Sequence, residues 1–294
     1  MRWNKITLVG VGLLGGSLGL ALRRRKLAKV VAGFVRRETS LKECERAGAT
    51  DFATTDLLAA VSNADLVVLC TPLTQMKPLV NQMIPALKKG AIVTDVGSVK
   101  GSVVNQIESL LSGTGAHFVG SHPMAGGERQ GVSAARADLF ESAVCVVTPT
   151  AQTNQTALRK VERTWKAVGA RLLRTTPKAH DEFVSRSSHL PHLVAATLAT
   201  FVLNPRLSST QPKLCATGFR DTTRVASGSP EMWRDIAIAN RGALRIALDD
   251  FVRGLQGIQA LLRTKDEKAL LTFFQTAKSR RDHWVAQCVL PSPE

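Results

Sequence analysis

Short apolar runs alternate with stretches of helical periodicity along the first part of this 294-residue chain. The apolar runs cover residues 5–12, 30–35, 64–72, 90–98, 116–123, 142–149 and 170–177. Helical stretches lie between them, for example at 13–26, 74–88, 100–112 and 153–168. Strands that are apolar on both faces and separated by helices are typical of a parallel sheet with helices on both sides. The pattern predicts a doubly wound, Rossmann-type α/β domain over residues 1–177.

The strand-like runs stop after Pro177, and the pattern that follows is helical. Residues 178–204 predict a helix that Pro191 kinks or breaks, because proline lacks the N–H that the preceding turn needs. We therefore predict a second, all-helical domain over residues 178–294.

A further helix is predicted to begin at Ser229, with Pro230 at its first position. Its apolar residues recur at three- and four-residue steps as far as Leu262, which places them on one face. Such a face needs a partner, and we expect it to pair two copies of the chain into a homodimer through the C-terminal helices.

A glycine-rich turn follows the first apolar run, with the spacing G-x-G-x-x-G. Gly10 permits the tight turn, Gly12 lets backbone approach a pyrophosphate, and Gly15 allows close packing of helix on strand. The helix that opens at Leu13 and Leu14 offers free N–H groups and a partial positive charge to phosphates. Because strand and helix flank the motif, it predicts a dinucleotide site rather than a turn without a ligand.

The end of the second apolar run indicates which dinucleotide is bound. NAD sites usually place an acidic residue there, but Val35 occupies that position and Arg36 and Arg37 follow. An arginine pair without the carboxylate favours a 2′-phosphate, and hence NADP. Glu38 lies three residues beyond Val35, so NAD remains the alternative.

Several polar groups follow the later strands. Ligands of such sheets bind beyond the carboxyl ends of the strands, so these groups are expected at the cofactor crevice. The expected crevice residues are Thr71, Pro72, Gly97, Ser98 and His122. A histidine with a pKa near neutrality at this place is suited to proton transfer.

Composition narrows the class of protein further. No apolar run reaches the roughly 18 residues that span a bilayer. The five cysteines are scattered without a C-x-x-C pair, which favours a reducing compartment, so we expect a cytoplasmic protein without a metal cluster. The net charge of +16 comes without a basic tail or basic stretches interleaved with aromatics, and it favours anionic small molecules over nucleic acid.

Five segments together resemble the prephenate/arogenate dehydrogenases of tyrosine biosynthesis. They are GVGLLGGSLGLAL, DVGSVKG, GSHPMAGGERQG, SHLPHLVAATLA and GFRDTTRVASGSPEMWRDI. The resemblance implies a Rossmann domain, a helical dimerisation domain and a site between them. It implies a reaction in which a cyclohexadienol gives a hydride to the nicotinamide, its hydroxyl loses a proton, and its ring carboxylate leaves as carbon dioxide.

The resemblance also implies roles for individual residues. His122 accepts the hydroxyl proton, Ser98 hydrogen-bonds His122 and the substrate hydroxyl, and Arg224 binds a substrate carboxylate. His192, the second histidine of SHLPH, matches a histidine near the substrate in prephenate-using members. The expected neighbours are His189, Arg220 and Trp233.

Some of these residues have structural interpretations as well. Ser98 stands where it would cap the helix that begins near Lys100, and Arg224 could be a surface ion-pair partner. His189 and His192 are three residues apart on one helical face, but no third ligand accompanies them, so we reject a zinc site.

Three alternatives stay open at this point. Arogenate competes with prephenate as substrate, although His192 and the basic balance favour the more anionic prephenate. A β-hydroxyacid dehydrogenase shares the two-domain plan but uses a helical lysine instead of His122. A dinucleotide-sensing regulator without catalysis is the non-enzyme alternative, which Ser98, His122 and Arg224 argue against.

Overall fold

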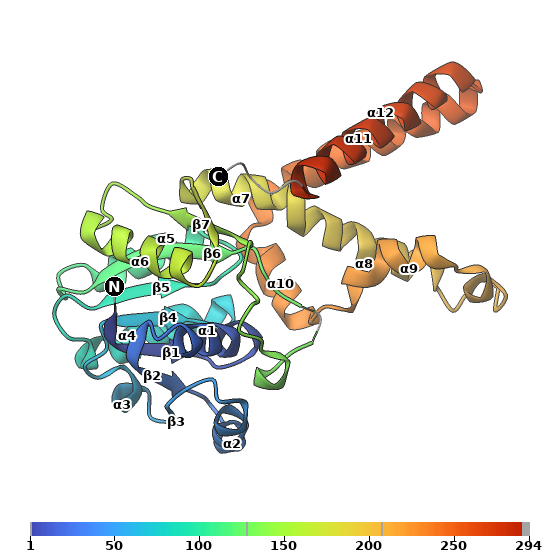
Figure 1. The fold of residues 1–294 in the computed structure, drawn as a ribbon. Coiled ribbons are helices and arrows are strands. Elements are labelled where there is room, and N and C mark those ends of the chain that lie inside the picture. The colour runs from blue at the N-terminus through green and yellow to red at the C-terminus, as the bar shows by residue number, and fades with distance from the viewer. Residues whose placement is uncertain (1, 128, 207, 290–294) are drawn as a thin grey trace. The chain divides into compact units, whose positions relative to one another are not determined.

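An eight-stranded sheet organises the N-terminal part of the chain (Figure 1). The computed structural model describes residues 2–127, 129–206 and 208–289. The spatial order of the strands is β3-β2-β1-β4-β5-β6-β7-β8. Their bounds are β1 (Trp3–Val9), β2 (Ala28–Phe34), β3 (Phe52–Thr54), β4 (Leu66–Leu69), β5 (Ile92–Asp95), β6 (His117–Pro123), β7 (Val144–Thr148) and β8 (Arg171–Arg174). The predicted Rossmann-type sheet is confirmed.

The pairing within the sheet differs from a purely parallel one at a single place. The first six strands in that spatial order, from β3 through β6, pair in parallel. Strand β7 runs antiparallel to β6, with His122 opposite Val146. Strand β8 is again parallel to β7. Between β6 and β7, the described residues 124–127 and 129–143 hold the short 3₁₀ turn Val132–Ala134 and no crossover helix, which a parallel return usually needs.

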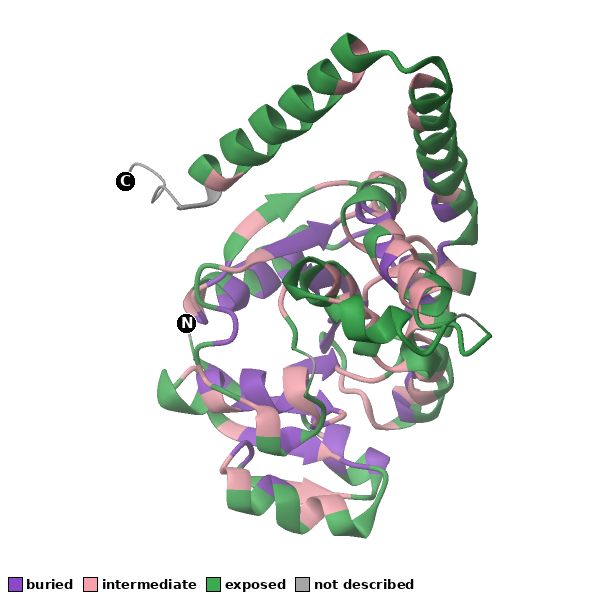
Figure 2. Ribbon diagram, turned by 90° about the vertical axis from the view of Figure 1, so that its right-hand side faces the viewer, coloured by how far each residue is buried: buried purple, intermediate pink, exposed green. Residues whose placement is uncertain are grey.

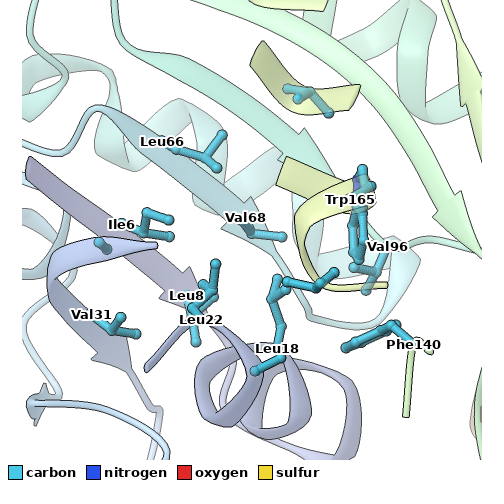
Figure 3. Close-up of a cluster of buried hydrophobic side chains, with 14 of the residues drawn as sticks. Ile6, Leu8, Leu18, Leu22, Val31, Leu66, Val68, Val96, Phe140 and Trp165 are labelled. Carbon is cyan, nitrogen blue, oxygen red and sulfur yellow. The ribbon is translucent and has the colours of Figure 1, made fainter. Parts of the chain in front are cut away.

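Helices cover both faces of the sheet and produce two apolar clusters. They are α1 (Leu13–Arg24), α2 (Glu38–Ala47), α3 (Leu57–Val61), α4 (Leu73–Met83), α5 (Gly101–Leu111) and α6 (Gln155–Ala167). Ile6 and Leu8 of β1 belong to one cluster, while Val9 belongs to the other, as alternation along a strand requires. In the first cluster Phe140 meets Trp165 edge to face, with ring centroids 5.4 Å apart (Figure 3). Figure 2 shows the resulting burial along the strands.

The elements that follow β8 are helical, as predicted. They are α7 (Pro177–Val184), α8 (Leu190–Val202), α9 (Thr217–Thr223), α10 (Pro230–Ala239), α11 (Arg241–Thr264) and α12 (Glu267–Val289). A π-helical turn, Ser185–His189, separates α7 from α8 directly before Pro191. The wider turn is the form that the predicted interruption at Pro191 takes, because the proline cannot donate to the turn before it.

The helix that was expected to run from Ser229 to Leu262 is two helices. The Ser229 hydroxyl caps α10 as predicted, accepting a hydrogen bond from the Met232 N–H. However, α10 ends at Ala239, because Asn240 leaves helical geometry and its amide bonds groups elsewhere in the fold.

By packing, the chain forms two compact units, Met1–Leu244 and Arg245–Glu294. The change from strands to helices falls between β8 and α7, whereas the division by packing falls after Leu244. The predicted domain boundary at residue 177 stays a prediction. Most of the second unit is coloured as exposed (Figure 2). Its exposed apolar side chains include Leu255, Leu262, Phe274 and Trp284. Within the described residues, none of the helices has the length and apolarity needed to span a bilayer.

Candidate active site

The glycine turn between β1 and α1 has the geometry that a dinucleotide site needs. Gly10 has a φ of +96°, which side chains rarely tolerate. A Cβ added to Gly15 would lie 2.0 Å from the Gly10 carbonyl oxygen, so only glycine permits this helix–strand contact. A Cβ at Gly12 would meet nothing within 4 Å, so this residue borders open space at the start of α1.

The residues around this turn fit a bound dinucleotide. Within the described ranges no side chain caps the N-terminus of α1, and Leu13 and Leu14 of its first turn are half-buried. At the end of β4, the Thr71 hydroxyl is buried and has no hydrogen-bond partner in the part of the chain that the structure describes. Pro72 then begins α4 as its cap residue. Free helix N–H groups and an orphaned hydroxyl are groups that a phosphate and a ribose would satisfy.

The end of β2 presents arginines and not an acidic residue. Val35 is buried, whereas Arg36, Arg37 and Glu38 are exposed at the start of α2. Among the described residues, neither arginine forms an ion pair, so both guanidinium groups are available to an anion.

His122 lies near the end of β6 and is only 8% exposed. Its Nδ1 is 2.9 Å from Nε2 of His180, and the two rings meet edge to face. Nδ1 of His180 is in turn 2.8 Å from Oδ1 of Asp181. The sequence analysis missed His180 and Asp181, since both sit in an ordinary amphipathic helix, α7, without a motif around them.

A buried ion pair lies beside His122. Lys100 and Asp95 are both fully buried and form a salt bridge, and Nζ of Lys100 also donates to the Ser121 carbonyl at 2.9 Å. Asp95 accepts backbone N–H bonds from Gly97 and Ser121, which ties the ends of β5 and β6 together. The charge of Lys100 acts directly on the neighbouring imidazole.

His122 is therefore a neutral base at neutral pH. Burial lowers its pKa well below the ordinary value, and the nearby Lys100, His180 and His189 lower it further. A neutral imidazole is the form that accepts a proton.

Ser98 is half-buried between β5 and α5, and its predicted capping role is wrong. The cap position of α5 is Lys100, and no side chain on the helix's own entry segment caps it. Asp181 does so instead, accepting the backbone N–H groups of Lys100 at 2.7 Å and Gly101 at 2.8 Å. Among the described residues no hydrogen bond joins Ser98 to His122, and its role toward that residue stays a prediction.

An apolar cavity of about 270 Å³ lies among α8, α10 and the turn before α10. Two histidines and Trp233 supply its polar and aromatic wall. The ring of His192 stacks on Trp233, while His189 meets the same indole edge-on. The predicted residues His189, His192 and Trp233 are thus brought together.

Hydrogen bonds fix which ring nitrogen of each cavity histidine carries the proton. The Asn240 amide donates to Nδ1 of His189 at 3.1 Å, so the proton of neutral His189 is on Nε2, which is buried and lacks a partner among the described residues. Burial lowers the pKa of His189 to about 4, against smaller opposing effects of Asp181 and the Ser98 backbone. Nδ1 of His192 donates to the Ser188 carbonyl at 3.0 Å.

The two predicted arginines differ in their surroundings. Burial lowers the pKa of His192, and the charge of Arg224 adds to this effect, which places Arg224 near that imidazole. Arg220 instead pairs with Asp221 on the surface and does not line the cavity.

Fold and site together define a class of enzyme. A glycine-rich crevice that fits a dinucleotide, a buried neutral histidine at a strand end and an apolar cavity are the parts of an NAD(P)-dependent dehydrogenase. Two family models match the chain: "Prephenate dehydrogenase, nucleotide-binding domain" over residues 18–174 and "Prephenate dehydrogenase, dimerization domain" over residues 176–276. The chain belongs to the prephenate dehydrogenase family, which confirms the resemblance and the enzyme class predicted from the sequence.

Individual relatives agree with this assignment. The chain is 34% identical to cyclohexadienyl dehydrogenase of Zymomonas mobilis over 282 residues, which cover 95% of each protein. It is 31% identical to prephenate dehydrogenase from Aquifex aeolicus in complex with hydroxyphenyl propionate and NAD+, with a TM-score of 0.90 over 96% of this chain and 99% of that one. Synechocystis arogenate dehydrogenase is 33% identical, with a TM-score of 0.81 over 95% and 99%.

Proposed function

We propose that this enzyme converts prephenate to 4-hydroxyphenylpyruvate and carbon dioxide, with NAD(P) as hydride acceptor. The observation that carries the proposal is His122, a neutral buried base at the strand end beside the dinucleotide crevice. The bound dinucleotide supplies an acceptor for the hydride that leaves the ring carbon bearing the hydroxyl. His122 takes the hydroxyl proton as the carbonyl forms, and the ring carboxylate departs as carbon dioxide when the ring becomes aromatic.

The cavity residues bind the substrate in this proposal. Arg224 pairs with a substrate carboxylate, since a guanidinium binds a carboxylate through two parallel hydrogen bonds. The Nε2–H of His189, which forms no hydrogen bond of ordinary geometry among the described residues, donates to a substrate oxygen in this proposal. His192 and Trp233 hold the apolar ring, and Ser98 binds the reacting hydroxyl.

We assign NADP as the preferred cofactor, with NAD as the alternative. Arg36 and Arg37 are exposed at the end of β2, and no acidic residue takes the position that would bind a ribose hydroxyl. The Aquifex aeolicus structure named above holds NAD+, which supports NAD as the alternative cofactor.

The same proposal includes a homodimer through the C-terminal helices. The matched dimerization model covers residues 176–276, and α11 and α12 expose apolar side chains that water does not favour. The molar mass of the purified chain by light scattering tests this part.

The deciding experiment is a matrix of initial rates, with prephenate and arogenate each paired with NAD and NADP. Formation of reduced nicotinamide in the prephenate–NADP reaction, faster than in the other three, is the expected result. A dominant rate with arogenate would establish the alternative that the Synechocystis relative favours. The proposed function would be overturned if all four reactions were inactive and the enzyme either oxidised 3-hydroxy acids or only bound the cofactor.

A further inference from the structure

His122, His180 and Asp181 form a continuous chain of hydrogen-bonding groups. Nδ1 of His122 contacts Nε2 of His180, and Nδ1 of His180 contacts Oδ1 of Asp181, at 2.9 and 2.8 Å. His122 comes from β6, whereas His180 and Asp181 are adjacent residues of α7. Both imidazoles are buried, and His180 is only 1% exposed, so water does not compete for these contacts.

The Asp181 end of this hydrogen-bonded series is fixed by backbone N–H groups of another segment. Oδ1 of Asp181 accepts the Lys100 N–H and Oδ2 accepts the Gly101 N–H, at the start of α5. An ionised carboxylate only accepts hydrogen bonds, and the positive end of the helix dipole favours its charge. The hydrogen that His180 shares with Asp181 therefore belongs to Nδ1 of His180.

This anchor constrains the proton between the two imidazoles. When His180 carries a single ring proton, on Nδ1, its Nε2 has a lone pair and accepts from His122. His122 must then carry its proton on Nδ1, which leaves the lone pair on Nε2. Within the described residues, nothing donates to Nε2 of His122.

The hydrogen-bonded series also brings a negative charge to bear on the protonated base, whereas the carboxylate of Asp95 is already paired with Lys100. Lys100, His180 and His189 all disfavour a cation at His122. The carboxylate of Asp181, reached through His180, acts in the opposite sense and stabilises the imidazolium that proton transfer creates.

We propose that His180 and Asp181 are positioning residues that set the tautomer of His122, so that Nε2 is the atom that receives the substrate proton. This inference rests on the proposed function for the identity of that proton. On transfer, the O–H bond of the substrate breaks and an Nε2–H bond forms. The Nδ1 proton stays between the two imidazoles, and no proton moves on to Asp181.

Nitrogen NMR tests the tautomer without any turnover. The chain has six histidines, and the full-length protein with ¹⁵N-labelled histidine would show the two ring nitrogens of each. The His122 signals are identified by their loss in His122→Asn. A protonated Nδ1 and an unprotonated Nε2 at neutral pH are expected. The reverse tautomer would overturn the proposal, whatever the enzyme's substrate proves to be.

Two substitutions of His180 separate positioning from packing. A glutamine can accept from His122 and donate to Asp181, whereas a leucine of similar volume can do neither. His180→Gln should keep the Nδ1–H tautomer of His122 and lose roughly 10-fold in kcat, while His180→Leu should lose the tautomer preference and roughly 10²- to 10⁴-fold in kcat with little change in KM. Equal kcat values in the two folded variants would overturn the proposal.

The charge of Asp181 is tested by Asp181→Asn, with Glu182→Gln as the matched control on the exposed face of the same helix. Loss of the carboxylate should lower kcat by roughly 10²-fold and move the acid limb of the His122 titration to lower pH, because an opposite charge favours the cation. The control should change neither quantity. An unmoved titration in Asp181→Asn would contradict the role given to its charge. If wild-type enzyme turned over no cyclohexadienol, the NMR titration would still decide this point, so the two failures are distinguishable.

Discussion

The imidazole of His192 lies almost flat on the indole of Trp233, with ring centroids 3.5 Å apart and planes 25° apart. The two residues come from α8 and α10, so the contact joins two helices at the wall of the cavity. With its Nδ1 bound to the Ser188 carbonyl, His192 is held by its face and by one edge. Among the described residues, no hydrogen bond engages its Nε2.

Removal of this stack should weaken substrate binding. Trp233→Leu keeps an apolar wall but leaves His192 held by one contact, and the stacking that is lost is worth about 0.5–1.5 kcal/mol. We expect KM for substrate to rise roughly 3- to 10-fold while kcat changes less. Steady-state kinetics measures both values, with Met232→Leu on the exposed side of the same helix as control. An unchanged KM would remove Trp233 from the substrate site.

Loss of the base should act on turnover and not on cofactor binding. His122→Asn removes a positioned proton acceptor, so kcat should fall roughly 10²- to 10⁴-fold. Affinity for the dinucleotide, measured by fluorescence titration, should stay within error. His117→Asn, at the opposite end of the same strand, is the control. Near-normal turnover in the first variant would end the assignment of His122.

Activity should persist to lower pH than an ordinary histidine allows. Burial lowers the pKa of His122, so the base stays neutral as pH falls past 6.5 and protonates only well below it. The acid limb of kcat/KM should therefore appear clearly below pH 6.5. A limb at or above that value would show that another group, or a different environment of His122, controls the rate.

Stability should decrease on mild acidification. The pKa of His189 is lowered to about 4 in the fold, whereas the unfolded chain binds a proton near pH 6.5. The stabilisation from neutral His189 is thus fully present above pH 6.5 and is lost as pH falls toward 4. The free energy of unfolding should drop by on the order of 1–2 kcal/mol from this residue between about pH 7.5 and pH 5. Urea unfolding of wild type and His189→Gln measures the difference, and identical pH slopes would contradict it.

Much of the architecture could be predicted because its determinants are local. The glycine turn at Gly10 and the cap at Ser229 depend on neighbouring residues, and both formed as expected. The end of α10 at Asn240 depends instead on hydrogen bonds to the Asp181 carbonyl and to His189, both distant in sequence. For that reason periodicity alone extended the helix too far.

The candidate site shows the same division. His122 and the cavity histidines stood in motifs, whereas His180 and Asp181 matter only because α7 packs against the ends of β6 and α5. Likewise, the direction of β7 is set by its pairing with β6 and not by its own apolar pattern.

The arginines after β2 give a prediction on cofactor choice. Replacing Arg36 and Arg37 together by alanine removes two unpaired guanidinium groups from the end of that strand. KM for NADP should rise at least about 10-fold, the effect of losing charge-assisted hydrogen bonds to a phosphate, while KM for NAD should hardly change. Arg46→Ala, on the far end of α2, is the control. A parallel loss with both cofactors would mean that the pair does not read the 2′-phosphate.

The π-helical turn Ser185–His189 sets the rotation of α8 about its axis relative to α7. A π turn holds about one more residue than an α turn, and each residue advances a helix by about 100°. The extra residue therefore rotates α8 relative to α7. As a result His180 contacts β6 and Asp181 contacts the start of α5, while His192 lines the cavity. Deleting the exposed Ser187 from it would turn the second half by about 100°, even though every side chain of the site would still be present.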